Sequence, residues 1–407
     1  MEAVSRAGKA FLTSTSDMLQ SALVSSSQSA TNNHSDSLTK DLVVKEILIH
    51  PIKSCRGTSV RSALFDHQGL QYDRTWLIID ATTKKFYTAR ELPKMVLIHP
   101  KINHDTNKLS IEIPQSETGT PASTVEVALQ PNEEDVKQFE VVDGIFIWGA
   151  YVDGYAVSKE ADEKLSAYFG KQVRLVRKGP SPRESGPTNP DGKVEWDDAV
   201  LRYQDFFPCL VASAESLRDV QKTLTASVYP AQSNNVGEAK SFKVPERVNR
   251  EYWTPEELSS LPITRFRPNI IIDNAPALHS STSSSNRLSA WEEDGWTAAE
   301  LFDTDTIPSP PPMGAEAEGL GRAGIYMLAK CARCMVPNID PDTGVRDNFL
   351  PYRVLQEYRQ VDKVAATKGK PCFGMLSVPR EKQGVVKVGD IWRVTKTTDP
   401  STRPSPL

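Results

Sequence analysis

The chain has 407 residues, of which 39% are hydrophobic and 25% charged, a composition typical of a folded globular protein and unlike collagen, a coiled coil or a wholly disordered chain. Its 48 basic and 52 acidic side chains give a formal net charge of −4, which offers no electrostatic reason to expect a nucleic acid or an anionic membrane as partner. No apolar run approaches the roughly 18 residues that a membrane-spanning helix needs, so no transmembrane segment is expected.

The first 42 residues are rich in Ser, Thr, Asn and small side chains, and we predict that they form a disordered tail. Arg6 and Lys9 give this segment some character of a mitochondrial presequence, but Glu2 and Asp17 are acidic residues that such presequences avoid. The five cysteines are an odd number without an apparent secretory signal, which indicates free thiols in a reducing compartment. We therefore expect a cytoplasmic protein, with a mitochondrial location as the alternative.

Short runs rich in β-branched residues follow the tail, separated by Gly, Asp, Asn and Pro. Their spacing is typical of an antiparallel sheet that closes into a barrel or a sandwich, and not of a series of βαβ units. The predicted strands of this part of the chain span residues 43–49, 75–79, 95–98, 109–113, 125–129, 139–142, 145–148 and 173–176.

Helices are fewer, and we predict four of them from capping residues and apolar spacing. Ser158 caps a helix that stops at Gly170, and Ser213 caps a second. Thr254 precedes a proline and two glutamates, which is the pattern of a capping box with Pro at the first helical position. The fourth helix spans residues 354–361.

The C-terminal half alternates further strands with polar or proline-rich loops. Strands are predicted at residues 270–272, 325–328 and 385–394, and loops at residues 179–198, 232–260, 277–286 and 303–319. The chain is therefore predicted to be mostly β, in the α+β class, with a domain boundary near residues 177–186.

Two glycine-containing motifs are better explained as turns than as ligand sites. Residues 319–324 match GxGxxG, but a loop precedes them and a strand-like run follows, whereas a dinucleotide site needs a strand before and a helix after the glycines. Residues 340–344 begin like a calcium loop, but the third oxygen ligand and the bidentate Glu of an EF-hand are missing. A tight turn is the better interpretation of both.

The tetrapeptide that pairs Cys331 with Cys334 is the most chemically suggestive motif. A structural zinc site would need a second close pair of cysteines, and a dithiol redox motif would be expected at a helix N-terminus in a βαβ unit. A single thiolate, with its pKa lowered by the flanking Lys330 and Arg333, would be a natural ligand in a sulfur-rich transition-metal site. Two incidental buried cysteines explain the pattern on its own equally well.

Basic and polar side chains also stand at the ends of several predicted strands: Lys53, Ser54, Arg74, Arg90, Arg267 and Asn269. Lys and Arg can hold a phosphate, and an Asn amide can both donate to and accept from the edge of a heterocycle. Each of these residues taken singly is more typical of a solvated surface.

Considered together, these segments resemble those of MOSC-domain proteins, specifically the mitochondrial amidoxime-reducing component family of molybdenum enzymes. The matching segments occur in family order across residues 43–395. They are residues 50–57, 72–77, 88–90, 266–270, 331–334, 340–344, 358–360 and 388–390.

The resemblance implies an N-terminal MOSC-N β-barrel-like domain over residues 43–177 and a MOSC β-barrel domain with a few helices over residues 178–400. Polar insertions would lie near residues 232–260 and 303–319. The cofactor would be molybdenum-molybdopterin (Moco), bound between the domains, with Cys334 as the catalytic residue and the metal ligand. By the same resemblance, the cofactor-binding residues besides Cys334 would be Lys53, Ser54, Arg74, Arg267, Asn269 and Arg333.

The resemblance also implies the reaction, which is reduction of small N-hydroxylated substrates such as amidoximes. Electrons would come from a cytochrome b5-type haem protein and its NADH-dependent reductase. The alternative is a sulfur-transfer or carrier protein of the molybdenum cofactor, because MOSC domains also form the C-terminal part of molybdenum cofactor sulfurases. Four positions depart from the family pattern and put the substrate range in question: Phe206, Phe207, Ala332 and Leu376.

Overall fold

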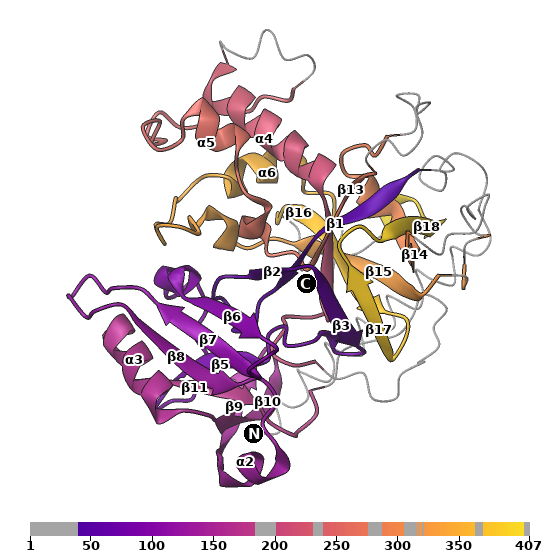
Figure 1. Ribbon diagram of the computed structural model, residues 1–407. Coiled ribbons are helices and arrows are strands. Elements are labelled where there is room, and N and C mark those ends of the chain that lie inside the picture. Colours follow the sequence, from indigo (N-terminus) through magenta and orange to yellow (C-terminus); the bar gives the residue numbers. More distant parts are fainter. Residues whose placement is uncertain are drawn as a thin grey trace, which may run out of the picture.

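The computed structural model describes residues 40–183, 201–230, 239–275, 287–304, 316, 318–319, 321–362 and 369–402 (Figure 1). Nearly all of the predicted N-terminal tail and much of the predicted loops at 179–198, 277–286 and 303–319 lie outside these residues. Among the described residues, no helix combines the length and the apolar character needed to span a bilayer.

The largest sheet is a barrel, which confirms the prediction of a mostly β fold. Its strands follow in the order β13-β12-β16-β15-β14-β18-β1-β2, and because β13 also pairs with β1, all of them except β2 close into a ring. Their bounds are β1 Leu42–Ile49, β2 Thr58–Val60, β12 Cys209–Ser213, β13 Ile270–Asn274, β14 Trp296–Phe302, β15 Ala323–Ala332, β16 Cys372–Pro379 and β18 Ile391–Thr397.

Strand β1 comes from the start of the described chain and yet belongs to the barrel of the C-terminal half. It pairs antiparallel with β13, where Val43 lies opposite Asp273, and with β18, where Val43 lies opposite Ile391. Closing the ring in this way removes two exposed sheet edges. The two halves of the sequence are thus interleaved in the fold.

The remaining strands form three smaller antiparallel sheets beside the barrel, two of which lie at the lower left of Figure 1. One has the order β5-β11-β10-β9, another β6-β7-β8, and a third β17-β3-β4. The bounds are β3 Ser62–Asp66, β4 Gly69–Leu70, β5 Trp76–Asp80, β6 His99–Asn103, β7 Lys108–Ile113, β8 Ser123–Ala128, β9 Glu140–Ile147, β10 Ala150–Ala156, β11 Val173–Lys178 and β17 Gln383–Lys387. Buried side chains of β5, β7, β8 and β11 join those of the barrel in one apolar cluster, so the two halves share a core. The buried apolar side chains of β9 and β10 belong to a second cluster.

The predicted helix caps are present. In α3 (Lys159–Phe169) the Ser158 hydroxyl accepts from an amide of the first turn, and Gly170 ends the helix with a φ of 62°. Ser213 and Thr254 cap α4 (Ala214–Val228) and α5 (Pro255–Ser259) in the same way. Helix α2 (Glu133–Gln138), capped by Asn132, was not predicted.

Helix α6 (Tyr352–Tyr358) ends before the predicted limit at residue 361. A tertiary contact explains this early end, because the Arg359 carbonyl accepts a hydrogen bond from the amide of Cys372 at the start of β16, 2.9 Å away. Its guanidinium is buried and donates to Asp294 at 2.7 Å.

Four strand predictions were wrong in detail. Residues 95–97 belong to a 3-10 helix, η3 (Pro93–Leu97), since Pro93 begins a tight turn, and Ile98 follows it in an extended conformation. The runs at 139–142 and 145–148 form the single strand β9, in which Gly144 (φ 78°) accommodates an irregularity. Residues 385–394 divide into β17 and β18 at a turn through Gly389 (φ 96°), and β17 leaves the barrel to pair with β3.

Both glycine motifs contain turns, as predicted, and the described residues of the first lead directly into β15. A Cβ on Gly321 would lie 2.6 Å from Oε2 of Glu300, whose buried carboxylate pairs with Arg380, so this glycine leaves room for an ion pair. In the second motif, Oδ1 of Asp340 accepts from the amides of Asp342 (2.8 Å) and Thr343 (2.7 Å).

Candidate functional site

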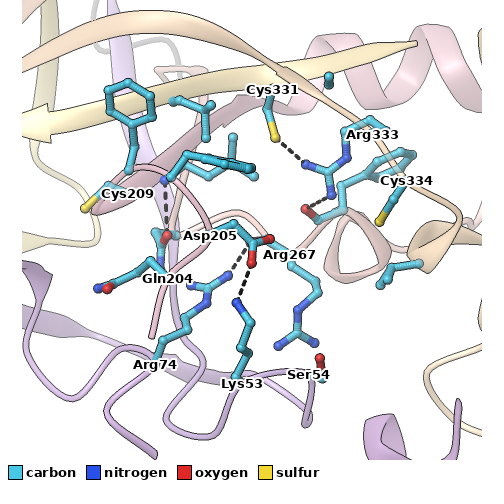
Figure 2. Close-up of a pocket in the computed structure, with 18 of the residues that line it drawn as sticks. Lys53, Ser54, Arg74, Gln204, Asp205, Cys209, Arg267, Cys331, Arg333 and Cys334 are labelled. Atoms are coloured by element: carbon cyan, nitrogen blue, oxygen red, sulfur yellow. Dashed lines mark hydrogen bonds and ion pairs between the residues drawn. The ribbon is translucent and has the colours of Figure 1, made fainter. Parts of the chain in front are cut away.

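A cavity of about 220 Å³ is lined by residues from both halves of the chain. It contains all seven residues that the resemblance assigned to the cofactor: Lys53, Ser54, Arg74, Arg267, Asn269, Arg333 and Cys334. Figure 2 shows Lys53, Ser54, Arg74 and Arg267 on one side of this cavity and Arg333 and Cys334 on another. The shared core of the two halves holds these walls in place.

On the basic side, Lys53 and Arg74 are each paired with a carboxylate. The buried Lys53 donates to the carbonyl oxygen of Tyr203 at 2.8 Å and forms an ion pair with Asp205. Arg74 donates to both carboxylate oxygens of Asp73, at 2.7 and 2.6 Å. Burial lowers the pKa of Lys53 although Asp205 opposes the shift. Burial works against ionisation of Asp73, but the Arg74 guanidinium and the hydrogen bonds from His50 together outweigh it and hold the pKa of that carboxyl at about 2.

Arg267 differs from these two cations. Its terminal nitrogen Nη2 is buried and has no hydrogen-bond partner among the described residues. Burial, followed by the nearby Arg74 charge, lowers the pKa of Arg267 to about 10. Leaving a buried donor unpaired costs free energy, so this side chain is prepared for an anion that completes its hydrogen bonds.

The backbone of the basic side is strained. Ser54, Arg74 and Arg267 all lie in the left-handed region, with φ of 69°, 47° and 56°. Residues other than glycine adopt this conformation only where the surrounding structure enforces it, and such residues cluster at functional sites. The backbone amide of Arg74 donates a hydrogen bond to the His50 carbonyl (2.8 Å), and that of Arg267 donates one to the Thr264 carbonyl (3.1 Å), which holds both residues in this conformation.

The cysteine motif begins with the last two residues of β15 and lines the same cavity. Arg333 donates from Nη1 to the Cys331 sulfur at 2.9 Å and from Nη2 to the Phe266 carbonyl at 2.7 Å. Burial raises the pKa of Cys331 and outweighs Arg333, which acts to lower it as expected. The second flanking cation, Lys330, is buried and donates to the Pro400 carbonyl.

The other thiols outside the motif are still less suited to act as thiolates. Burial raises the pKa of Cys55, Cys209 and Cys372 to about 12. A thiol must lose its proton to bind a metal, so these three are poor candidates. Cys334 is half-buried and its residue lines the cavity.

Asn269 is already engaged by the backbone. Its amide oxygen accepts from the Leu210 amide, and its amide nitrogen donates to the Leu48 carbonyl, both at 3.1 Å. It therefore joins β1, β12 and the start of β13, and one N–H of its side-chain amide is left for a ligand.

Sequence reasoning missed several residues of the cavity wall. Trp148, Gln204, Asp205 and Lys370 were not considered as site residues. A signal for Trp148 was present, because it stands before a glycine between two alternating runs, where a hairpin tip is expected. Arg90, which was noted, lines the cavity with its guanidinium 5.3 Å from the centre of the Trp148 ring system.

The chemistry of the cavity follows from these groups. Buried cations on one side favour a ligand with a phosphate or another anionic group. A sulfur side chain across from them is a soft donor of the kind that transition metals prefer. The arrangement suits an anionic cofactor that carries a transition metal.

Comparison with known families gives two matches in the same chain. Residues 41–172 match the MOSC N-terminal beta barrel domain, and residues 198–393 match the MOSC domain.

Similar curated proteins cover most of the chain at low identity. "Mitochondrial amidoxime-reducing component 1" of Mus musculus is 27% identical over 85% of this chain and 80% of its own length. The protein of the same name from Homo sapiens is 25% identical over 85% of this chain and 81% of its own length. "Molybdenum cofactor sulfurase" of Oryza sativa subsp. japonica is 24% identical over 85% of this chain, but the match spans 33% of that longer protein.

Proposed function

We propose that this chain, which belongs to the proteins built of a MOSC N-terminal domain and a MOSC domain, is a molybdenum-cofactor-dependent oxidoreductase. Its substrates would be small N-hydroxylated compounds such as amidoximes, in line with the names of relatives that cover most of the chain. The observation that carries the proposal is a single cavity in which Cys334 faces Lys53 and Arg74 from the other half of the sequence and Arg267 from its own half.

The residues present fit molybdopterin. The unpaired Nη2 of Arg267, with Lys53 and Arg74 beside it, would hold the phosphate, and Ser54 and Asn269 would add polar contacts. Cys334 would be the protein ligand to molybdenum, to which the cofactor's dithiolene also supplies sulfur. When bound, this cofactor supplies a metal that changes its oxidation state, and the protein fixes its position.

The reaction constrains what the protein must provide. Removing an N-bound hydroxyl group as water consumes two electrons and two protons. We propose a cytochrome b5-type haem protein with an NADH-dependent reductase as the source of electrons. The names of the relatives favour the mitochondrial alternative for the location over the cytoplasm.

The test is to measure molybdenum and pterin on protein purified from a host that makes the cofactor. Cys334→Ala should lose at least about tenfold in molybdenum content, because the metal loses its protein ligand. Cys209→Ala is the matched control, since this residue lines the same cavity and the pKa of its buried thiol, about 12, keeps it protonated. Wild-type protein without molybdenum, or Cys334→Ala with full occupancy, would overturn the proposal.

A second candidate function is sulfur transfer to the cofactor, favoured by the match to the rice sulfurase. It requires a sulfur donor and a persulfide on Cys331 or Cys334. Mass spectrometry after incubation with a cysteine desulfurase distinguishes the two functions. A persulfide without turnover of amidoximes would favour sulfur transfer.

A further inference from the structure

The cavity has an aromatic wall for which none of the seven assigned residues accounts. Trp148, Phe206 and Phe207 line it together with the aliphatic side chains of Leu210 and Leu376. The residues proposed to hold the phosphate and to add polar contacts lie outside this apolar wall, so the wall is available to another ligand. The ligand that must approach the same cavity is the substrate of the proposed reaction.

Trp148 is placed at this wall by the hairpin of β9 and β10. It adopts a φ of 44° and is followed by Gly149 with a φ of 92°, so the tip turns through two left-handed residues. This conformation is rare for a bulky residue, and a strained residue beside a cavity points to a functional role.

The indole is fixed by contacts on several sides. Its Nε1 donates to Oδ1 of Asp205 at 3.0 Å, and the Arg90 guanidinium lies 5.3 Å from its centre. The rings of Phe86 and Phe206 lie 5.6 and 6.0 Å away, the first nearly perpendicular and the second tilted by 32°. With these contacts made, 39% of Trp148 remains exposed. A held aromatic ring with free surface in a cavity is a stacking platform that costs little further entropy to use.

We infer that Trp148, supported by Phe206, is a specificity-determining residue that stacks on the planar group of an aromatic N-hydroxylated substrate. The chain therefore favours aryl over alkyl substrates. This inference rests on the proposed function for the identity of the reacting group. The preference for a planar aromatic group rests only on the aromatic wall of the cavity.

The experiment compares benzamidoxime with acetamidoxime, which share the reacting group and differ in the aromatic ring. Binding to the purified cofactor-loaded protein is measured by calorimetric titration, and kcat/KM is measured with a haem-protein donor and its reductase. Trp148→Ala should lower affinity and kcat/KM for benzamidoxime by about tenfold and change those for acetamidoxime much less.

Two further variants separate stacking from other effects. Trp148→Phe keeps an aromatic face and loses the hydrogen bond to Asp205, so it should retain most of the preference for benzamidoxime. Tyr151→Ala is the control on the same hairpin, because that side chain is 75% exposed and does not line the cavity. It should leave both substrates unaffected.

The inference is overturned if wild-type protein binds both compounds equally, or if Trp148→Ala weakens both by the same factor. Failure of the proposed function has a different signature, namely no turnover of either compound. In that case the calorimetric comparison of wild type and Trp148→Ala still decides whether the aromatic wall selects planar ligands.

Discussion

At the scale of single residues, Arg267 shows how a ligand site costs stability. Its guanidinium is held beside Arg74 in a left-handed backbone, and its buried Nη2 has no partner among the described residues. Burying this charged group without a full set of hydrogen bonds costs free energy when the protein folds. A bound phosphate would offset this cost by accepting a hydrogen bond from Nη2 of Arg267.

Replacing this residue should therefore have opposite effects on the empty and on the loaded protein. Arg267→Met should raise the free energy of unfolding of cofactor-free protein by about 1–3 kcal/mol, because a buried unsatisfied group is removed. It should lower pterin retention by about 10-fold to 100-fold, since a charge-assisted hydrogen bond is lost.

Denaturant unfolding of cofactor-free protein and pterin quantification of loaded protein measure the two effects. Arg174→Met is the control, because that guanidinium forms a bidentate pair with Glu140 on the surface, at 2.8 and 2.6 Å. A variant that is less stable when empty would show that Arg267 is a structural cation and not an anchor for an anion.

At the scale of elements, the 3-10 helix η7 (Glu292–Gly295) concentrates acidic groups inside the fold. Glu293 is fully buried, and its Oε2 accepts from the Ser216 hydroxyl at 2.8 Å. The neighbouring Asp294 pairs with Arg359, and Glu292 pairs with Lys40. Burial, reinforced by the Asp294 charge, raises the pKa of Glu293 to about 7.

This element should make stability depend on pH. Between the ordinary pKa of 4.5 and about 7, folded Glu293 holds a proton that the unfolded chain has released, so stability falls as pH rises through this range. The loss reaches the order of 3 kcal/mol. Glu293→Gln cannot ionise, and its stability relative to wild type should therefore increase between pH 5 and pH 8.

Urea unfolding at the two pH values measures this difference. Glu257→Gln, at an exposed position in α5, should show no such change relative to wild type. A constant difference between wild type and Glu293→Gln would mean that the buried carboxyl stays ionised throughout.

At the scale of the whole molecule, the barrel depends on a strand from the other end of the sequence. Four side chains of β1 are at most 3% exposed and join the main core: Leu42, Val44, Ile47 and Ile49. The strand also supplies the hydrogen bonds that close the ring between β13 and β18. The cavity then forms where the loops of both halves meet.

A fragment of residues 178–402 should therefore fail to fold cooperatively. It lacks β1, leaves the edges of β13 and β18 open, and loses roughly 1.5–3 kcal/mol for each buried side chain of that strand. Size-exclusion chromatography and thermal unfolding followed by circular dichroism provide the measurement. A fragment of residues 40–402 keeps β1 and is the control. Cooperative unfolding of the shorter fragment near the temperature of the control would contradict the interleaved fold.

The sequence was informative wherever a local rule governs structure. Ser158 and Gly170 bound α3 as predicted, because a hydroxyl cap and a left-handed glycine act within one turn. The same reasoning failed at Arg359 and at Gly389. The helix before Arg359 ends where its carbonyl accepts from Cys372, and the strand predicted at 385–394 is divided because β17 pairs with β3.

What the amino-acid sequence determined by itself is the set of local signals and motifs: mostly β structure, helix caps, turns, and the residue types from Lys53 to Cys334 that resemble a MOSC protein. Only the tertiary structure decided that β1 closes the distant barrel, that Arg267 is left unpaired while Lys53 and Arg74 are neutralised, and that Trp148 adds an aromatic wall. The physical reason is that caps and turns depend on neighbours within a few residues. Burial, pairing of charges and the shape of a cavity depend on atoms that the chain brings together from more than 200 residues apart, as Arg74 and Arg333 are in this cavity.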